Sequence, residues 1–524
     1  MVARRDATER FPGRPWLLLG CIGLIFGFAS VPLQWLAPAM IIDDALYYPR
    51  VAAHLVAGHG LTYDMQTITN GLHPLWGVLL IPAAWLSGGD HLLLLRVAMW
   101  LCAGFAAVAA VSVHVIGRRL GWRPLGTGVA VAALVIPRAD LWLGLLESAL
   151  SLGLLATLLA CAIRYDWLTT RSRVHLVAFG ALVAATFLAR LDFVFVLAAL
   201  GAATLWRRWR AGHRPAWICA DLGVVAGVAV LPVVPYLVAN RRFFGSIVPV
   251  SGQLKHAGLA SFDAFARAAL FPVEAVAARL NLPVAVVVVG GLVVVTAAVV
   301  TLRRRPVLVA GRPRLDQGGV IAALLAGTAL RWLYLRLFMT AEAGYTPWYW
   351  VPEYLCAALV LGWTAAHLQV RFQGLVTPSP RRQLLAAVLV VGVGATLVYR
   401  DGETDRERNQ PAFDNALWAR AHLPADKLFA MFDSGRFSYF AQRNTIALNG
   451  LIGDEALMEL ARAGDHAAML ARFQVDYLVA HVPAGAAIPP AAVVHEEAGR
   501  APGTGGARHR LMILDRRVFG GFMR

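Results

Sequence analysis

The sequence is poor in lysine, and Lys255 and Lys427 are its only two. Its five cysteines are far apart, so no Cys-x-x-Cys pair indicates a metal or redox site. There is also no Gly-x-Ser-x-Gly elbow, no phosphate-binding P-loop and no His-Glu-x-x-His zinc motif. These absences argue against a serine hydrolase, a P-loop nucleotidase and a zinc protease. The use of arginine in place of lysine is typical of a GC-rich bacterial genome.

Long apolar runs dominate what is present. Hydrophobic residues make up 58% of the chain and the mean hydropathy is +0.61, whereas soluble domains have about 45–50% apolar residues. Many runs are about 20 residues long, the length that a helix needs to cross about 30 Å of hydrocarbon. The stretch 16–36 is too long for a cleavable signal peptide, so we expect it to be the first membrane helix. The sequence therefore predicts an all-α polytopic bundle of 11–13 transmembrane helices over residues 1–399. The expected spans are 16–36, 74–87, 91–116, 125–138, 146–163, 174–189, 193–206, 216–238, 283–302, 318–338, 351–369 and 383–399.

The net charge of +17 comes from arginines that cluster between these runs. No basic stripe is interleaved with aromatic residues, so the charge indicates membrane sidedness and not nucleic-acid binding. By the positive-inside rule we expect a multi-pass protein of the bacterial cytoplasmic membrane, with its N-terminus inside and loop 37–73 outside. The arginine-rich loops from 118 onward fix a second orientation, which disagrees with this one by one crossing. One span between 74 and 138 is therefore missed or over-counted. The loops expected inside are 118–124, 164–173, 207–215, 303–316 and 370–382.

The tail 400–524 differs in character from the rest of the chain. It is charged, contains many Pro and Gly residues and has no membrane-length run. Short β-like runs alternate with helical stretches such as 454–473, which predicts a small extracytoplasmic α/β domain. The expected strands lie within 428–433, 444–449, 475–480 and 510–515.

The outside loop 37–73 carries the first candidate site. Asp43 and Asp44 follow the first expected span directly, where carboxylates are costly to desolvate and are therefore functional or well paired. Residues 45–57 are typical of an amphipathic helix at the membrane interface, with Arg50 and His54 on its wetter side. A structural alternative is that Asp43 caps a helix and pairs with Arg50. Asn70-Gly71 and His73-Pro74 then form a turn into the next span.

Other loops expected outside supply compatible groups. Charged residues stand at the ends of spans, and a polar loop over 240–256 contains one of the two lysines. The aromatic segment 342–354 fits an interface belt, and its rings could also stack on a sugar. The candidate substrate-binding residues are Arg50, His54, Asn70, His73, Glu147, Arg190, Asp192, Ser251, Gln253, Lys255, Trp348 and Tyr349.

The loop 41–76 resembles the first outer loop of the GT-C glycosyltransferase superfamily, whose members are polytopic and keep an acidic motif after the first helix. More narrowly, Asp43-Asp44, Arg50 and then Leu55-x-x-Gly58-x-Gly60 are similar to actinobacterial terminal arabinofuranosyltransferases, which use decaprenyl-phosphate arabinofuranose. The segment 68–76 departs from those enzymes, where a glutamate is expected, and this leaves the sugar open. The resemblance implies transfer of a sugar, with inversion, from a polyprenyl phosphate to an envelope glycan, lipid or protein acceptor.

Such a transfer needs a base and cations for the departing phosphate. We expect Asp43 or Asp44 to be the base, and Arg50, Arg190 and Lys255 to lie near the phosphate. No cofactor is required, although a divalent metal could bind at Asp43 and Asp44, as in some members of the superfamily. The alternatives are a multi-pass transporter or flippase, and a scaffold whose tail binds a partner. The acidic groups cluster at one face and not at mid-bilayer, which favours the transferase.

Overall fold

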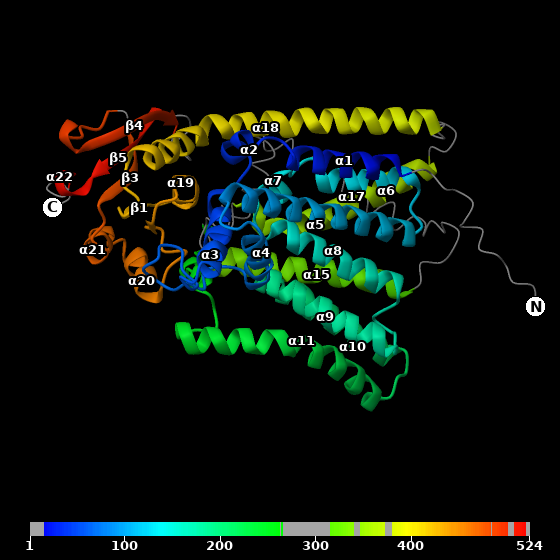
Figure 1. The fold of residues 1–524 in the computed structure, drawn as a ribbon. Helices are drawn as coiled ribbons and strands as arrows, with labels where there is room; N and C mark the ends of the chain where they lie inside the picture. Colours follow the sequence, from blue (N-terminus) through cyan, green and yellow to red (C-terminus); the bar gives the residue numbers. More distant parts are fainter. Residues whose placement is uncertain are drawn as a thin grey trace, which may run out of the picture.

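The computed structural model describes residues 15–261, 264–265, 315–339, 346–371, 380–483, 485–500 and 508–519. Within them, a bundle of roughly parallel helices is joined at one end to a smaller α/β domain (Figure 1). Short helices gather at that same end, beside the domain. The bundle helices are α1 (Trp16–Ala29), α2 (Leu33–Ala39), α5 (His91–Arg119), α6 (Pro124–Val135), α8 (Ser148–Arg164), α9 (Arg173–Ala189), α10 (Val194–Arg210), α11 (Pro215–Phe244), α15 (Leu315–Phe338), α17 (Val351–Arg371) and α18 (Pro380–His422). The short helices near the domain are η2 (Asp43–Leu46), α3 (Tyr47–Val56), α4 (Pro74–Leu86), α7 (Asp140–Leu143), η3 (Leu191–Phe193), α12 (Val250–Lys255) and η4 (Pro347–Trp350).

The length and apolarity of the helices confirm a multi-pass membrane protein. In the described part of the chain, five helices are long and apolar enough to cross a membrane, namely α5, α11, α15, α17 and α18. Several shorter apolar helices pack beside them. The expected span 283–302 lies outside the described residues, so the total of 11–13 spans stays a prediction.

The first expected span, 16–36, is broken. Helices α1 and α2 meet at an angle of 100°. Pro32 precedes α2 and cannot donate a backbone hydrogen bond, so the helix is interrupted there. The guanidinium of Arg96 donates to the carbonyl oxygens of Ala29 and, at 2.7 Å, of Val31. Arg96 therefore satisfies carbonyl groups that the break leaves without helical partners.

Helix α4 is shorter than expected for the span 74–87 and lies near the α/β domain. Its 13 residues extend over about 20 Å, less than the hydrocarbon thickness of about 30 Å. Both of its flanks contact the α/β domain. A Cβ on Gly71 would lie 2.1 Å from the carbonyl oxygen of Leu451, and the Tyr439 hydroxyl donates to the carbonyl of His91 at 2.6 Å. We infer from these contacts that α4 does not cross the membrane. Leaving it out of the count would resolve the disagreement of one crossing between the arginine-rich loops and the N-terminus.

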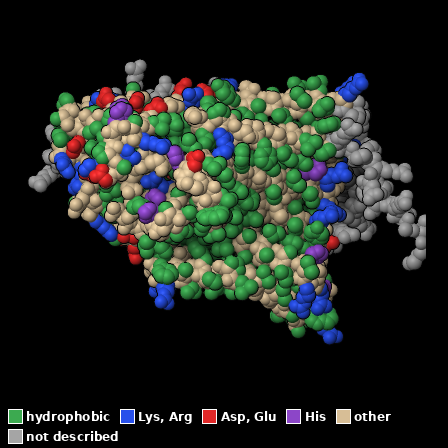
Figure 2. Space-filling model, viewed as in Figure 1, with side chains coloured by type: hydrophobic (Ala, Val, Ile, Leu, Met, Phe, Trp, Pro, Cys, Tyr) green, Lys and Arg blue, Asp and Glu red, His purple; other side chains and the backbone are tan. Residues whose placement is uncertain are grey.

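The two ends of the bundle differ in charge. Helices α5 and α10 begin at the domain end and finish in arginines, Arg118 and Arg119 in the first case and Arg207, Arg208 and Arg210 in the second. Figure 2 shows Lys and Arg side chains at the end away from the domain, with hydrophobic side chains over the bundle between the two ends. Clusters of arginines therefore mark the end opposite the domain, as the positive-inside rule predicts for the cytoplasmic ends of membrane helices.

The C-terminal sheet confirms the expected small α/β domain. The strand order is β2-β1-β3-β5-β4, with β1 parallel to β2 and β3, and β5 antiparallel to β3 and β4. Helix α18 runs without a break from the bundle into this domain, so the expected boundary at 399/400 falls inside a helix. The expected helical stretch 454–473 is divided at Gly464, whose φ of +69° ends α20. The sequence did not reveal β4. The elements are β1 (Phe429–Met431), α19 (Gly435–Ala441), β2 (Thr445–Ala447), α20 (Glu455–Ala463), α21 (His466–Arg472), β3 (Tyr477–Pro483), η5 (Pro490–Ala492), β4 (Val493–Arg500), β5 (Arg508–Asp515) and α22 (Arg516–Phe519).

The placement of α4 can be tested by thiol labelling in a variant that lacks the five native cysteines. Gln66→Cys and Asp90→Cys flank α4 at exposed positions, and exposed Ala211→Cys lies at the opposite end of the bundle. We expect an impermeant maleimide to label the first two variants from outside intact cells, and the third only after the membrane is opened. Loss of the Asp90 cap costs only about 1 kcal/mol, so that variant should fold. Labelling of Gln66→Cys and Asp90→Cys from opposite sides would mean that α4 crosses.

Candidate active site

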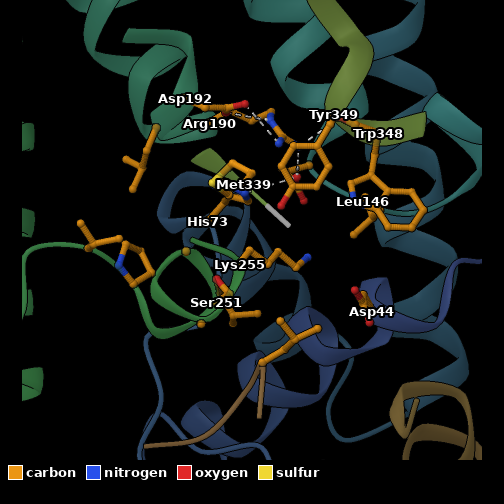
Figure 3. Close-up of a pocket in the computed structure, with 18 of the residues that line it drawn as sticks. Asp44, His73, Leu146, Arg190, Asp192, Ser251, Lys255, Met339, Trp348 and Tyr349 are labelled. Atoms are coloured by element: carbon orange, nitrogen blue, oxygen red, sulfur yellow. Dashed lines mark hydrogen bonds and ion pairs between the residues drawn. The ribbon is translucent and has the colours of Figure 1, made fainter. Parts of the chain in front are cut away.

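A cavity of about 480 Å³ lies at the end of the bundle beside the α/β domain. Its walls come from the loop after α2, the N-terminus of α8, the turn between α9 and α10, helix α12, the end of α15 and η4. Figure 3 shows candidate residues from these separate elements entering it together. The sequence-predicted residues that line the cavity are Asp44, His73, Glu147, Arg190, Asp192, Ser251, Lys255, Trp348 and Tyr349.

The two adjacent aspartates point to different places. Both aspartates lie in η2, which is a 3₁₀ helix. Successive residues of such a helix are about 120° apart around its axis, so the two side chains leave it in different directions. Asp44 lines the cavity. The carboxylate of Asp43 instead accepts hydrogen bonds from the backbone N–H groups of Gly435 (2.7 Å) and Arg436 (2.8 Å), at the start of α19. Glycine is required at 435, because a Cβ there would lie 2.0 Å from the Asp43 carbonyl oxygen. Asp43 therefore caps a helix of the C-terminal domain, and not its own helix.

Arg50 also contacts the C-terminal domain and does not line the cavity. Its guanidinium donates to the Arg443 carbonyl at 2.9 Å and to Asn444 Oδ1 at 3.3 Å. The buried Tyr63 hydroxyl donates to the Ser434 carbonyl at 2.9 Å. Together with Asp43, these contacts fix loop 41–73 against the domain. The expected role of Arg50 at a phosphate does not fit this placement.

Three further candidates lie outside the cavity. His54 Nδ1 is 2.9 Å from the Thr62 carbonyl, and burial lowers the pKa of His54 to about 4, with Arg50 adding to the effect. Asn70 Oδ1 accepts from the Val250 backbone at 3.0 Å, so it joins the loop to α12. Gln253 donates to the Val248 carbonyl within its own segment. Their contacts are local or structural.

A buried chain of alternating charges forms one wall of the cavity. Arg190 pairs with Glu147 at 2.6 Å and with Asp192 at 3.1 Å, and Arg331 pairs with Asp192 at 2.5 Å and with Glu353 at 3.0 Å. Arg190 and Arg331 are only 1% and 0% exposed. Burial alone would raise the pKa of Asp192, but the two guanidinium groups hold that pKa well below its usual range. Sequence analysis missed Arg331 and Glu353, although a charge inside an apolar span is itself a signal.

Cations and aromatic rings meet on the same side of the cavity. The Tyr349 ring lies near both Arg190 (Cζ 4.6 Å from the ring centroid) and Lys255 (Nζ 5.4 Å). Tyr48, which the sequence analysis did not single out, donates to Glu147 at 3.0 Å. It lies one helical turn after Asp44, a spacing that places both residues on one face. His73 Nε2 is 3.5 Å from Glu147, and burial lowers the pKa of His73, so its imidazole is neutral at pH 7.

The cavity thus combines three carboxylates, two cations and aromatic rings, a set suited to a reaction in which a hydroxyl loses a proton and an anion departs. Metal binding by both aspartates would require Asp43 to release its two backbone N–H donors. No cluster of three or more His, Cys, Asp or Glu side chains suited to a metal occurs in the described ranges.

Comparisons with known proteins place the fold. ArnT from Cupriavidus metallidurans, in a crystal structure with bound undecaprenyl phosphate, aligns with a TM-score of 0.53 at 14% identity, over 93% of this chain and 97% of ArnT. The structure of ArnT in the apo state aligns with a TM-score of 0.52 at 14% identity, over 94% of this chain and 98% of ArnT. The Archaeoglobus fulgidus oligosaccharyltransferase, in complex with Zn and sulfate, aligns with a TM-score of 0.49 at 13% identity, over 89% of this chain and 68% of the oligosaccharyltransferase. The likeness to ArnT confirms the expected GT-C-like fold, while the closer resemblance to arabinofuranosyltransferases stays a prediction.

Sequence comparisons add little to this. A family model described as a domain of unknown function, DUF8728, matches residues 400–510. No curated protein matches the chain. The fold and the cavity must therefore carry the functional argument.

The buried charge chain predicts the effect of Arg331→Gln. The substitution leaves Asp192 and Glu353 buried without their shared cation, so we expect a loss of about 3–5 kcal/mol in the free energy of unfolding. The melting temperature of the detergent-solubilised protein measures it. Arg408→Gln removes an exposed ion pair with Asp405 and should cost no more than about 1 kcal/mol. Equal melting temperatures for the two variants would contradict a structural role for the chain.

Proposed function

We propose that the protein is a membrane glycosyltransferase that moves a sugar from a polyprenyl phosphate to a hydroxyl acceptor. The observation that carries this proposal is the convergence of Asp44, Arg190 and Lys255 on one cavity, in a bundle with the fold of ArnT. The ArnT structure holds undecaprenyl phosphate, a lipid with a long apolar chain and an anionic head. A cavity with cations and apolar helix surfaces matches that chemistry.

Asp44 is the general base in this proposal. Its carboxylate takes the proton of the acceptor hydroxyl while the acceptor oxygen attacks the anomeric carbon of the sugar. The bond between the anomeric carbon and the phosphate oxygen breaks, and the phosphate leaves with the electron pair. A single displacement of this kind inverts the anomeric centre.

Lys255 and Arg190 stabilise the departing phosphate. The negative charge on the leaving oxygen grows toward the transition state, so fixed cations beside it lower the barrier. Arg190 is held in place by Glu147 and Asp192, and little reorganisation is needed when the charge develops. Lys255 provides a point charge from the other side of Tyr349.

The remaining walls accommodate the sugar and the donor chain. Trp348 and Tyr349 offer rings on which a sugar can stack, and the prenyl chain follows the apolar surfaces of α9, α10 and α15. Those surfaces consist of Phe187, Val194, Phe195, Tyr334 and Leu335. Arabinofuranose remains our proposal for the sugar, on the basis of the loop motif.

The proposed reaction takes place on the extracytoplasmic face without a resident metal. The location is supported by the arginines at the opposite end of the bundle. The absence of a metal requirement is supported by Asp43, whose carboxylate is engaged with α19. The acceptor is an envelope molecule that presents a hydroxyl.

The aspartate pair provides a matched test. We expect Asp44→Asn to lower sugar transfer from decaprenyl-phosphate arabinofuranose by about 10²–10⁴-fold, because the general base is lost. Asp43→Asn should instead lower the stability by about 1.5–3 kcal/mol, because it weakens charge-assisted bonds to α19. Near-normal transfer by Asp44→Asn would remove the base assignment. If the wild-type protein transports the lipid but transfers no sugar, it is a transporter or flippase.

The phosphate site can be tested through donor kinetics. We expect Lys255→Ala to raise KM for the donor and to lower kcat, because the lysine charge acts on both the bound and the departing phosphate. Lys255→Arg should be milder. Arg241→Ala is the control, since this exposed cation is near α12 in sequence but does not line the cavity. If the alanine variant of Lys255 behaves like that of Arg241, the phosphate site lies elsewhere.

A further inference from the structure

A second cavity, of about 280 Å³, adjoins the first. It is formed by α3, the segment 69–74, α4 and the last two turns of α11. Tyr48, Leu72 and His73 line both cavities and so form the wall between them. Apolar side chains predominate in the second cavity, and no Lys or Arg occurs among the described residues that line it.

This second cavity reaches the outer surface of the bundle. Val78 of α4 and Phe243 of α11 line it and are 57% and 66% exposed. Both residues lie at the domain end, where α11, a helix suited to crossing the membrane, finishes. An apolar cavity that opens at this level is accessible to a chain from the bilayer.

His73 gives the shared wall a polar contact that is not satisfied. Its Nδ1 atom is buried and has no hydrogen-bond partner in the part of the chain that the structure describes. Its Nε2 atom faces the Glu147 carboxylate, which favours a proton on Nε2 in the neutral ring. Nδ1 is then an acceptor whose donor is not supplied by the described residues.

We propose that the second cavity binds the apolar chain of a lipid acceptor whose uncharged hydroxyl head group passes His73 to reach Asp44. This inference rests on the proposed function and names the acceptor class, a lipid alcohol or glycolipid with an acyl or alkyl chain. His73 binds and positions the head group, and Asp44 removes the proton.

The donor chain does not fit this second cavity. In a polyprenyl phosphate the chain is bonded directly to the phosphate, so it must begin beside the cations. Arg190 and Lys255 lie in the first cavity, which has its own apolar wall. No cation occurs among the described residues that line the second cavity, which disfavours a phosphate and suits an uncharged head group.

A glycine provides a way to fill the second cavity. Gly77 of α4 lines it, and a Cβ added there would meet no atom within 4 Å. Gly77→Phe should therefore place a ring in the apolar space without strain. Gly227→Phe on α11 is the matched control, because Gly227 also has open space and lines neither cavity.

The experiment uses the full chain in phospholipid nanodiscs with a dodecyl glycoside that carries a diazirine at the end of its chain. We expect light to attach the probe to α4 and to the last turns of α11, and unlabelled dodecyl glycoside to compete. Gly77→Phe should reduce this labelling, and raise KM for dodecyl glycoside as sugar acceptor, by about tenfold or more, since lost contact with two buried methylenes weakens binding by about that factor. Gly227→Phe should change neither quantity. The Kd for decaprenyl phosphate should be the same in all three proteins.

Four outcomes would overturn the inference. Labelling that neither Gly77→Phe nor the competitor reduces would indicate bulk lipid contact only. Weaker decaprenyl phosphate binding in Gly77→Phe would assign the cavity to the donor chain. Equal transfer to methyl and dodecyl glycosides, with no labelling of α4, would discard the lipid acceptor and leave the proposed function intact. Conversely, specific labelling in a protein that transfers no sugar would discard the proposed function and the acceptor role, and leave only a lipid-binding cavity.

Discussion

The geometry of the site depends on a guanidinium that is buried between two carboxylates. Arg190 is 1% exposed and contacts Glu147 from α8 and Asp192 from the turn before α10. A buried charge without its partner costs several kcal/mol, so these groups must stay together if the helices are to pack as they do. Arg331 of α15 and Glu353 of α17 extend the same requirement to two more helices. One chain of alternating charges therefore fixes the ends of four helices around the cavity.

The C-terminal domain imposes the second constraint, on the parts of the cavity that are not helical. It holds loop 41–73 through Asp43, Arg50 and Tyr63. It also reaches the segment that carries Lys255, because Arg462 of α20 donates to the Gln253 carbonyl at 3.2 Å. The carboxylate and the lysine are thus positioned by one body, and Leu451 of that body lines the cavity. A domain that matches a family of unknown function is, in this chain, a structural part of the site.

The sequence predicted the features that follow from local chemistry. Charges at the ends of apolar runs identified Asp44, Glu147, Arg190 and Asp192, because such groups are costly in a membrane wherever the chain folds. Lys255 was identified as one of only two lysines, in a polar loop expected outside. Sequence reasoning could not separate Asp43 from Asp44, since their difference arises from a contact with α19, nearly four hundred residues away. It placed a membrane span at α4 because apolarity alone does not reveal that both ends of a helix contact the same domain. It likewise assigned Arg50 to a phosphate, because its long-range partners, Arg443 and Asn444, are invisible in the local pattern.

The two cavities differ in a way that fits two substrates of unlike charge. The first has cations beside an aromatic ring, and the second is lined without cations and ends at a neutral imidazole. Neutrality of His73 matters for this division. A protonated ring would place a positive charge on both sides of the shared wall and would allow a phosphate to bind in either cavity. Burial lowers the pKa of His73, and the nearby cations Arg190 and Lys255 act in the same direction, whereas Glu147 and Asp192 raise it. The cations proposed to hold a phosphate in the first cavity therefore also lower the pKa of the imidazole in the shared wall. In the proposed reaction, one arrangement of side chains would thus separate an anionic leaving group from a neutral nucleophile.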